Sequence, residues 1–372
     1  MTGERFSVVY RICGAEPVAL EQAKTIGLEQ TVELGAELVP EGDIRDWIVG
    51  RLERFTPVQE GVFEAEISYA VETSAFELTQ LLNVIFGNTS IKPGIRVEHL
   101  DLGAGLLNRF SGPQFGIQGL RKMLGVDSEP LLCSALKPMG KSPQELAELA
   151  YRFALGGMDI IKDDHGLTDQ PFCPYRERVK ACAEAVARAA EKTGKPCVYV
   201  PNVTAPAPAI AERVKFAKAM GAGGLLIAPG LTGFDTLRAL AEDDTINLPI
   251  ISHPALLGSL VTSRENGLSH GVLFGQLQRI AGADASIYPN YGGRFAFTRQ
   301  ACADIANSCR APMGNYRPIF PTPGGGMTLE KIPDMLELYG KDVLFLMGGG
   351  LYGRSPDLVE NVRYFLSLVG RG

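Results

Sequence analysis

A lysine, two aspartates and a histidine stand together in this sequence, where Lys162-Asp163-Asp164-His165 directly follows the apolar residues 158–161. Charged groups at the end of a buried strand are costly unless they are paired or bind a metal. Carboxylates favour a hard, oxygen-liganded cation such as Mg²⁺. An ammonium cannot ligate a metal, so Lys162 either neutralises the aspartates or is carbamylated by CO₂ and gains an anionic oxygen. The residue types leave both routes open, together with a third alternative, solvated charges at a strand end.

Two glycine triplets offer a second kind of chemistry, Gly324-Gly325-Gly326 and Gly348-Gly349-Gly350. Without a Cβ, a glycine backbone can bring its N–H group close to an anion. A single triplet is usually only a turn. Two triplets at neighbouring strand ends predict a phosphate site, with Gly325, Gly326, Gly349 and Gly350 as the binding residues.

The elements that must position these residues alternate regularly from residue 131 onward. Eight short apolar runs are each followed by a helix-like segment, and the runs are 131–136, 158–161, 197–200, 224–227, 249–252, 285–288, 318–321 and 343–347. This alternation predicts an α/β protein with a (β/α)8 barrel over residues 111–372. The first 110 residues mix strand-like and helical pieces and predict a smaller α+β domain. An open doubly wound sheet is the rival fold, but it would usually show fewer units and a GxGxxG turn near its start, where none is present.

Composition excludes several functional classes. The chain has 372 residues, 45% of them hydrophobic, and a net charge of −6, with no basic patch for nucleic acid. No apolar run approaches the roughly 18 residues of a membrane span. Seven cysteines form no CxxC pair, and this odd number is typical of reduced thiols in a cytoplasm. We therefore expect a cytoplasmic protein with a small-molecule partner.

Several ordered motifs resemble the RuBisCO large-subunit superfamily. Residues 156–164 resemble its GGxDxxKDDE activation segment, and Leu136-Lys137-Pro138 resembles its first-strand motif. Residues 112–118 resemble the GPxxGIQ segment that precedes the barrel, and both glycine triplets match in order and spacing. The resemblance covers nearly the whole chain. It implies an α+β domain followed by a barrel, and a Mg²⁺ ion held by a carbamylated lysine that stabilises an enediolate.

The positions at which the sequence departs from the family pattern indicate which branch of the family it resembles. Met139 replaces the second lysine of the first-strand motif, His165 replaces a metal-binding glutamate, and Pro254 replaces a phosphate-binding arginine. Residues 292–298 offer no counterpart of the carboxylation lysine. CO₂ fixation on a bisphosphate is therefore not expected. The chain resembles a form IV RuBisCO-like protein, and its residues 137–140 and 162–166 resemble the branch that acts in apionate breakdown.

The resemblance also implies roles for the site residues. Lys162 becomes the carbamate ligand and Asp164 a second ligand. His165 is a third ligand or an acid–base group, or water takes the third position, because imidazole is an unusual ligand for Mg²⁺. Asp163 is expected to point away from the metal, as strand alternation requires. Lys137 is the candidate proton donor, with a salt bridge to the Asp164 region as the alternative.

The family pattern contains two phosphate sites, and the one that is retained here indicates the class of substrate. The glycine-built site remains and the arginine is lost, which predicts a sugar monophosphate or a phosphorylated sugar acid. Asn202 and His253 are candidates to bind substrate hydroxyls, although either residue could be structural. In family members the positions of Glu29, Thr31 and Asn83 contribute from the neighbouring subunit, which implies a homodimer with shared active sites.

Three functions fit this pattern. The first is decarboxylation of 3-oxo-isoapionate 4-phosphate, or transfer and hydrolysis of its carboxyl group, because loss of CO₂ from a β-keto acid yields the same enediolate. The second is an enolase or isomerase of a methylthio-sugar phosphate in methionine salvage. The third is a sugar-phosphate-binding protein without catalysis. The sequence favours the decarboxylase.

Overall fold

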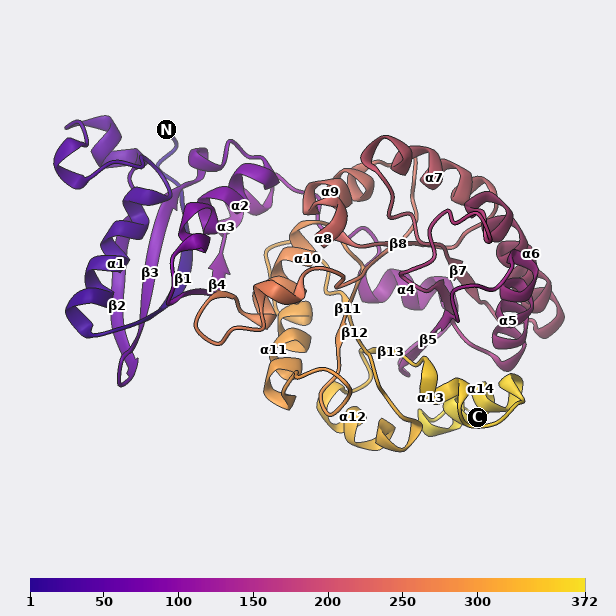
Figure 1. Cartoon of the computed structure of the whole chain (residues 1–372). Helices are drawn as coiled ribbons and strands as arrows, with labels where there is room; N and C mark the ends of the chain where they lie inside the picture. The colour runs from indigo at the N-terminus through magenta and orange to yellow at the C-terminus, as the bar shows by residue number, and fades with distance from the viewer. Residues whose placement is uncertain (372) are drawn as a thin grey trace.

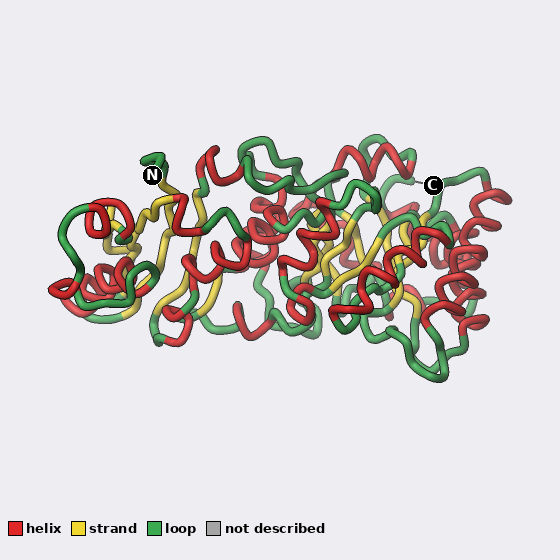
Figure 2. Tube along the Cα trace, turned by 90° about the horizontal axis from the view of Figure 1, so that it is seen from above, coloured by secondary structure: helices red, strands yellow, loops and turns green. Residues whose placement is uncertain are grey.

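The protein consists of an N-terminal α+β part and a C-terminal barrel that lie side by side (Figure 1). The computed structural model describes residues 1–371. The view turned by 90° shows the same arrangement, with the N-terminus and the C-terminus in different parts (Figure 2). The predicted fold, a (β/α)8 barrel preceded by an α+β domain, is confirmed.

The N-terminal part is a five-stranded sheet with helices. Its own antiparallel strands are β1 (Arg5–Cys13), β2 (Arg51–Gln59), β3 (Val62–Ala70) and β4 (Ile95–Asp101). Its helices are α1 (Glu16–Glu29), α2 (Leu78–Phe86) and α3 (Gly103–Leu107). Every second side chain of β1 is buried, as expected for a strand with one face on a core. Strand β2 shows no such alternation, because it is an exposed edge strand.

A fifth strand joins this sheet from the barrel half of the chain. Strand β10 (Gly267–Leu268) pairs in parallel with β4, with Gly267 opposite Arg96. The sheet order is β10-β4-β1-β3-β2. The N-terminal sheet is therefore not built from residues 1–110 alone, and β10 brings β4 up to the segment that follows the fifth barrel strand.

The barrel contains eight parallel strands, as the alternation predicts. They are β5 (Leu131–Leu136), β6 (Ile160–Asp163), β7 (Val198–Val200), β8 (Leu225–Ile227), β9 (Ile250–Ser252), β11 (Ala285–Pro289), β12 (Phe320–Gly324) and β13 (Leu344–Leu346). The larger helices around them are α5 (Pro143–Gly156), α6 (Tyr175–Thr193), α7 (Ala207–Ala219), α9 (Phe234–Glu242), α11 (Arg299–Arg310), α12 (Ile332–Tyr339) and α14 (Leu358–Leu368). The strands form two ladders, β12-β11-β9-β8 and β13-β5-β6-β7. A bridge between Asn202 and Leu226 joins β7 to β8, and β12 contacts β13 at the other seam.

Local sequence determines how β6 enters the barrel. Helix α5 begins after Ser142, whose side chain forms a reciprocal capping box with Glu145. The helix ends at Gly157, which adopts a left-handed conformation with φ of 98°. The chain then turns directly into β6, whose four residues are all buried. This compact connection places Lys162 inside the barrel wall.

The barrel is closed at its amino-terminal end and open at the other. Helix α4 (Gly116–Leu124) packs Ile117, Leu120 and Leu124 against the strand side chains that fill the interior. At the same end Arg371 forms two hydrogen bonds with Asp159, at 2.6 and 2.7 Å. The carboxyl ends of the strands are therefore where a ligand can enter. No helix within residues 1–371 is both long and apolar enough to cross a lipid bilayer.

Candidate active site

A large cavity lies at the carboxyl ends of the barrel strands. Its volume is about 1340 Å³, and it is lined by Lys137, Lys162, Asp164, His165, His253 and both glycine triplets. Residues from five different strand ends thus meet in one space, as the barrel topology requires.

Lys162 lies at the bottom of this cavity and is almost completely buried. Only 1% of the residue is exposed, and its Nζ donates to the backbone oxygen of Asp163 at 2.9 Å. Burial disfavours the ammonium form and lowers the pKa of Lys162. The neutral amine is the form that reacts with CO₂, so this environment suits carbamylation.

Asp164 is the anionic centre of the cavity. Its Oδ1 lies 2.9 Å from Nζ of Lys137 and 3.5 Å from Nδ1 of His165. Burial acts to raise the pKa of Asp164, but hydrogen bonds from His165 and Lys137 and the charge of Lys162 together hold that pKa well below its usual range. Asp164 is therefore a carboxylate at any physiological pH.

Asp163 points to the other side of β6, as predicted. Its Oδ2 lies 3.2 Å from Nε of Arg178, and its Oδ1 accepts from the hydroxyl of Tyr199 at 2.7 Å. The backbone N–H of Asn202 donates to the same carboxylate at 3.0 Å. Both charged side chains of the Asp163–Arg178 pair are 0% exposed. This carboxylate is a structural anchor and is not available to a metal.

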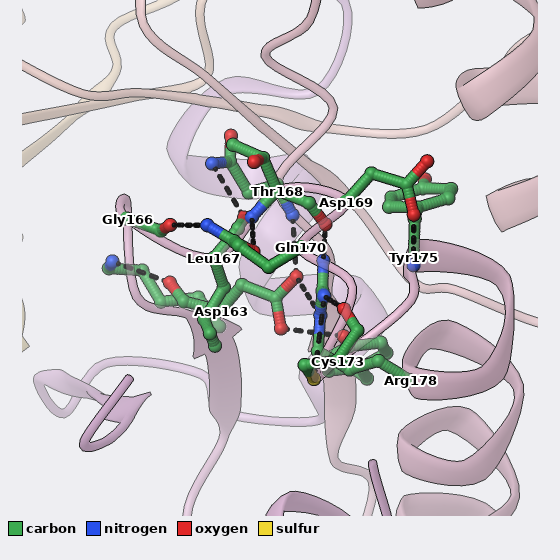
Figure 3. A network of polar contacts seen from close by, with 12 residues as sticks. Asp163, Gly166, Leu167, Thr168, Asp169, Gln170, Cys173, Tyr175 and Arg178 are labelled. Atoms are coloured by element: carbon green, nitrogen blue, oxygen red, sulfur yellow. Dashed lines mark hydrogen bonds and ion pairs between the residues drawn. The ribbon is translucent and has the colours of Figure 1, made fainter. Parts of the chain in front are cut away.

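Arg178 extends that anchor to the loop that carries His165. Its guanidinium also donates to the backbone oxygens of Cys173 and Thr168, at 3.0 and 2.7 Å (Figure 3). Asp169 accepts from the backbone N–H of Tyr175 at 2.7 Å, where α6 begins. The loop between β6 and α6 is thus held from several sides, which fixes the backbone next to Asp164 and His165.

His165 and His253 face each other across the mouth of the barrel. Their rings stack at a centroid distance of 4.4 Å with an interplanar angle of 14°. The backbone N–H of Ala255 donates to Nδ1 of His253 at 3.2 Å. Burial, together with the charges of Lys162 and His165, lowers the pKa of His253 to about 2. His253 is therefore neutral and carries its proton on Nε2, as a hydrogen-bond donor.

Lys137 is positioned by the eighth strand–helix unit. The hydroxyl of Tyr352, in the short helix α13 (Gly349–Tyr352), accepts from the backbone N–H of Lys137 at 3.3 Å and donates to the oxygen of Ala135 at 3.1 Å. A Cβ built on Gly348 would lie 3.9 Å from Cε of Lys137. The lysine side chain therefore runs beside the second glycine triplet towards Asp164.

Both glycine triplets lie close to neighbouring backbone. A Cβ on Gly350 would lie 2.5 Å from the backbone oxygen of Met327, and one on Gly326 would lie 2.8 Å from the backbone nitrogen of Arg294. Gly325 and Gly326 also have positive φ angles of 80° and 91°. Side chains are excluded at these positions, so the backbone itself borders the cavity.

The residues around Asp164 fit Mg²⁺ on one condition. Within residues 1–371, no group of three or more histidine, cysteine, aspartate or glutamate side chains could hold a metal. Asp164 and His165 supply two donors, while the ammonium groups of Lys137 and Lys162 would repel a cation. A carbamate on Lys162 would replace one positive charge with an anionic oxygen ligand. The donor set is therefore suitable for Mg²⁺ only when Lys162 is modified.

Asn202, for which both substrate binding and a structural role were considered, does not line the cavity of this chain. It is 1% exposed, and its amide nitrogen donates to the backbone oxygens of His165 and Leu167 at 2.9 and 3.0 Å. Its Oδ1 accepts from the backbone N–H of Thr204 at 3.1 Å. Both polar atoms of its side chain are hydrogen-bonded within the protein, so Asn202 positions the His165 loop.

The three candidates from the N-terminal part lie outside the cavity of their own chain. Nζ of Lys92 lies 2.6 Å from Oε2 of Glu29, and the hydroxyl of Thr31 donates to the oxygen of Gly27 at 2.6 Å. Asn83 is an α2 residue whose amide donates to Gln80. None of the three borders the cavity. A role in catalysis would require a second subunit.

Sequence reasoning missed the residues that approach the cavity from β4 and β10. Arg96 and Glu98, 3.5 Å apart, line it together with His270, whose ring meets Phe297 edge-on at 4.6 Å. Local sequence carries no signal for this contact, because it depends on the pairing of β10 with β4. Arg294 also lines the cavity. Its position just after the sixth barrel strand could have predicted this from the sequence.

Comparison with known proteins agrees with this geometry. The family model "Ribulose bisphosphate carboxylase large chain, catalytic domain" matches residues 116–294. Over 366 residues the chain is 37% identical to ribulose bisphosphate carboxylase-like protein 1 of Rhodopseudomonas palustris, and the match covers 98% of each. Over 367 residues it is 36% identical to 5-methylthioribulose-1-phosphate isomerase of Rhodospirillum rubrum, with 98% and 96% covered.

A solved structure leads to the same conclusion. The fold matches the crystal structure of a Rubisco-like protein from Rhodopseudomonas palustris with a TM-score of 0.89 and 35% sequence identity, over 99% of this chain and 98% of that chain. Sequence identity above 30% over almost the full length of these relatives shows that the chain belongs to the same family as they do. The chain belongs to the RuBisCO large-chain family, as a form IV RuBisCO-like protein.

Proposed function

We propose that this protein is an enzyme that isomerises or enolises a sugar monophosphate, of the kind named for its Rhodospirillum rubrum relative, 5-methylthioribulose 1-phosphate. The observation that carries the proposal is the Lys137–Asp164 contact of 2.9 Å beside buried Lys162, in the same cavity as two side-chain-free glycine turns. This arrangement combines an anion site with groups that can hold and move a proton. The full-length match to a protein named as an isomerase supports this reaction over the decarboxylation that the sequence alone favours.

Each part of the site has a task in this reaction. The backbone N–H groups of Gly325, Gly326, Gly349 and Gly350 would bind the phosphate. His253 would donate its Nε2 proton to a substrate oxygen, and Lys137 would deliver or accept the proton that moves between neighbouring carbons. When bound to carbamylated Lys162, Asp164 and His165, Mg²⁺ would supply Lewis acidity that favours loss of a proton next to the carbonyl.

A second candidate is decarboxylation of 3-oxo-isoapionate 4-phosphate. It is supported by residues 137–140 and 162–166, which resemble the apionate branch. Loss of CO₂ from a 3-oxo acid leaves an enediolate that needs only a proton, which Lys137 could supply. The two reactions therefore share a site and differ in which bond is broken first, C–H or C–C.

One pair of assays separates these candidates. The protein, preincubated with bicarbonate and Mg²⁺, is supplied with 5-methylthioribulose 1-phosphate in D₂O, and deuterium incorporation is followed by NMR. In parallel, CO₂ release from 3-oxo-isoapionate 4-phosphate is measured. Deuterated isomer without CO₂ release supports the proposal, and CO₂ release without exchange contradicts it.

The assay needs variants that separate catalysis from simple binding. Lys162→Met should abolish turnover. Lys141→Met is a matched control, because Lys141 is paired with Glu145 on the surface. If neither substrate is converted while both bind equally to the wild-type protein and the Lys162→Met variant, the protein is a sugar-phosphate-binding protein without catalysis.

A further inference from the structure

The cavity extends beyond the barrel strands to the N-terminal sheet. Its volume of about 1340 Å³ exceeds the roughly 300–1,000 Å³ that is usual for a small-molecule site. The additional lining comes from β4, from residues 269–271 after β10 and from α11, and these segments carry none of the residues of the proposed active site. We call this part the side chamber, and its lining includes Arg96, Glu98, Arg264, His270, Phe297 and Asp304. The cavity therefore has room for a second ligand beside the substrate.

Backbone contacts fix the wall of the side chamber next to β4. The N–H of Ser269 donates to the backbone oxygen of Val97 at 2.7 Å, and the Ser269 hydroxyl donates to the backbone oxygen of Glu98 at 3.0 Å. These bonds continue the pairing of β10 with β4 and hold His270 beside that strand. The side chamber is thus built where the N-terminal sheet meets the barrel.

Glu98 is the least satisfied charge of the side chamber. Its carboxylate lies 3.5 Å from the guanidinium of Arg96, farther than the roughly 2.7–2.9 Å of a charge-assisted hydrogen bond. Within residues 1–371 no donor forms a hydrogen bond with this carboxylate, although the side chain is only 23% exposed. Burial raises the pKa of Glu98 against the charge of Arg96, and the carboxylate of Asp304 raises it further. An ammonium group placed between Glu98 and Asp304 would offset this repulsion.

The charges of the side chamber are balanced in sign. Arg96 and Arg264 are positive, whereas Glu98 and Asp304 are negative. A ligand with a single charge would match only one of these pairs, and a zwitterion would match both.

Aromatic rings form the apolar wall of the side chamber. The ring of Phe297 meets the ring of His270 edge-on at 4.6 Å, and its centroid lies 5.9 Å from that of Phe274. Phe274 in turn lies 6.5 Å from Tyr288, and all four residues line the cavity. A ligand held by the charged groups would therefore place its remaining part against aromatic carbon.

We propose that the side chamber binds a free α-amino acid with an apolar side chain, as a second ligand distinct from the sugar phosphate. Its carboxylate would meet Arg96 and Arg264, and its ammonium group would meet Glu98 and Asp304. Its side chain would pack against Phe297. Such a ligand would contact β4 and α11 together and so link the N-terminal sheet to the barrel.

Four probes test which parts of the ligand are recognised. Binding to the full-length protein is measured by calorimetry. L-Norleucine carries both charges and an apolar chain, hexanoate lacks the ammonium group, pentylamine lacks the carboxylate, and glycine lacks the chain. We expect L-norleucine to bind at least about tenfold more tightly than each of the others, the order expected for one charge-assisted hydrogen bond or for several buried methylene groups.

Variants locate the site. Glu98→Gln and Asp304→Asn each remove one negative charge with little change in size, and each should weaken L-norleucine about tenfold without weakening hexanoate. Glu66→Gln is the matched control, because Glu66 lies in the neighbouring strand β3, pairs with Arg54 at 3.3 Å and does not line the cavity. Lys162→Met should also bind L-norleucine as the wild type does, because Lys162 belongs to the proposed active site.

The outcomes separate this inference from the proposed function. Absence of L-norleucine binding, equal binding of L-norleucine and hexanoate, or full affinity in both Glu98→Gln and Asp304→Asn would overturn the amino-acid site. A loss of affinity in Lys162→Met as large as that in Glu98→Gln would place the ligand in the active site and would also overturn it. The predicted order of affinities supports the side chamber as a second site even when neither sugar phosphate is converted, in which case only the proposed reaction fails.

Discussion

Nζ of Lys137 lies 2.9 Å from Oδ1 of Asp164, and this contact ties the ends of the first and second barrel strands together. The pair has two consequences. It keeps a proton-bearing group beside the proposed reaction centre, and it occupies a carboxylate oxygen that a metal would need. If Mg²⁺ binds to Asp164, we expect it to weaken this ion pair, which makes the role of each partner testable.

Replacement of Lys137 by methionine should have opposite effects on turnover and metal binding. We expect kcat to fall by about 10²–10⁴-fold, the usual contribution of a general acid–base group. Mn²⁺ affinity, measured by electron paramagnetic resonance, should rise, because the Asp164 oxygen is released from its partner. A fall in Mn²⁺ affinity would contradict the competition between lysine and metal.

Metal binding should depend on CO₂ through Lys162. In the wild-type protein, bicarbonate should increase Mn²⁺ affinity at least about tenfold, because the carbamate adds an anionic ligand. Lys162→Met should bind Mn²⁺ weakly with or without bicarbonate, whereas Lys141→Met should behave as wild type. If bicarbonate still increased the Mn²⁺ affinity of Lys162→Met, the effect of bicarbonate would not arise at Lys162.

His253 should make the fold sensitive to acid. Burial lowers its pKa in the folded protein to about 2, against about 6.5 for an unperturbed histidine. Between these values the unfolded chain binds a proton that the folded protein does not, so stability from this residue is lost as the pH falls below about 6.5. The urea midpoint of His253→Gln should therefore decline less between pH 7 and pH 5 than that of the wild type, with the exposed His99→Gln as control. Parallel declines in all three proteins would contradict the assignment.

The buried Asp163–Arg178 pair should be essential for stability. Arg178→Leu leaves Asp163 buried without its charge partner, which typically costs about 3–5 kcal/mol. Arg176→Leu is the matched control, because Arg176 pairs with Glu212 on the surface, where such a pair contributes about 0–1 kcal/mol. Urea unfolding measures both losses, and similar values for the two variants would refute the anchoring role of Asp163.

A shared active site can be tested by mixing subunits. If Glu29, Thr31 and Asn83 act in the cavity of a partner subunit, Thr31→Ala and Lys162→Met should each be inactive alone. Refolded together in equal amounts, they should regain about a quarter of wild-type activity, because half of the dimers would contain one intact site. Absence of recovery in a mixture that forms dimers would mean that each chain builds its own site.

Much of the fold could be predicted from local sequence. The eight apolar runs are short and hydrophobic throughout, because parallel strands are covered on both faces, and this pattern is visible without a structure. Strand alternation also indicated that Asp163 and Asp164 point in opposite directions, as they do. Strand β2 carries little local signal, because it is an exposed edge whose side chains show no buried face.

By itself, the sequence determined the barrel and the neighbourhood of Lys162, Asp164 and the glycine turns, since topology alone brings strand ends together. Only the tertiary structure decided what each side chain does there. It showed the Asn202 side chain hydrogen-bonded to the loop that carries His165, and the His253 ring stacked on His165. It also brought Arg96 and Leu256 to the same cavity. The physical reason is that these properties depend on burial, backbone conformation and contacts between residues far apart in the chain, none of which local spacing records.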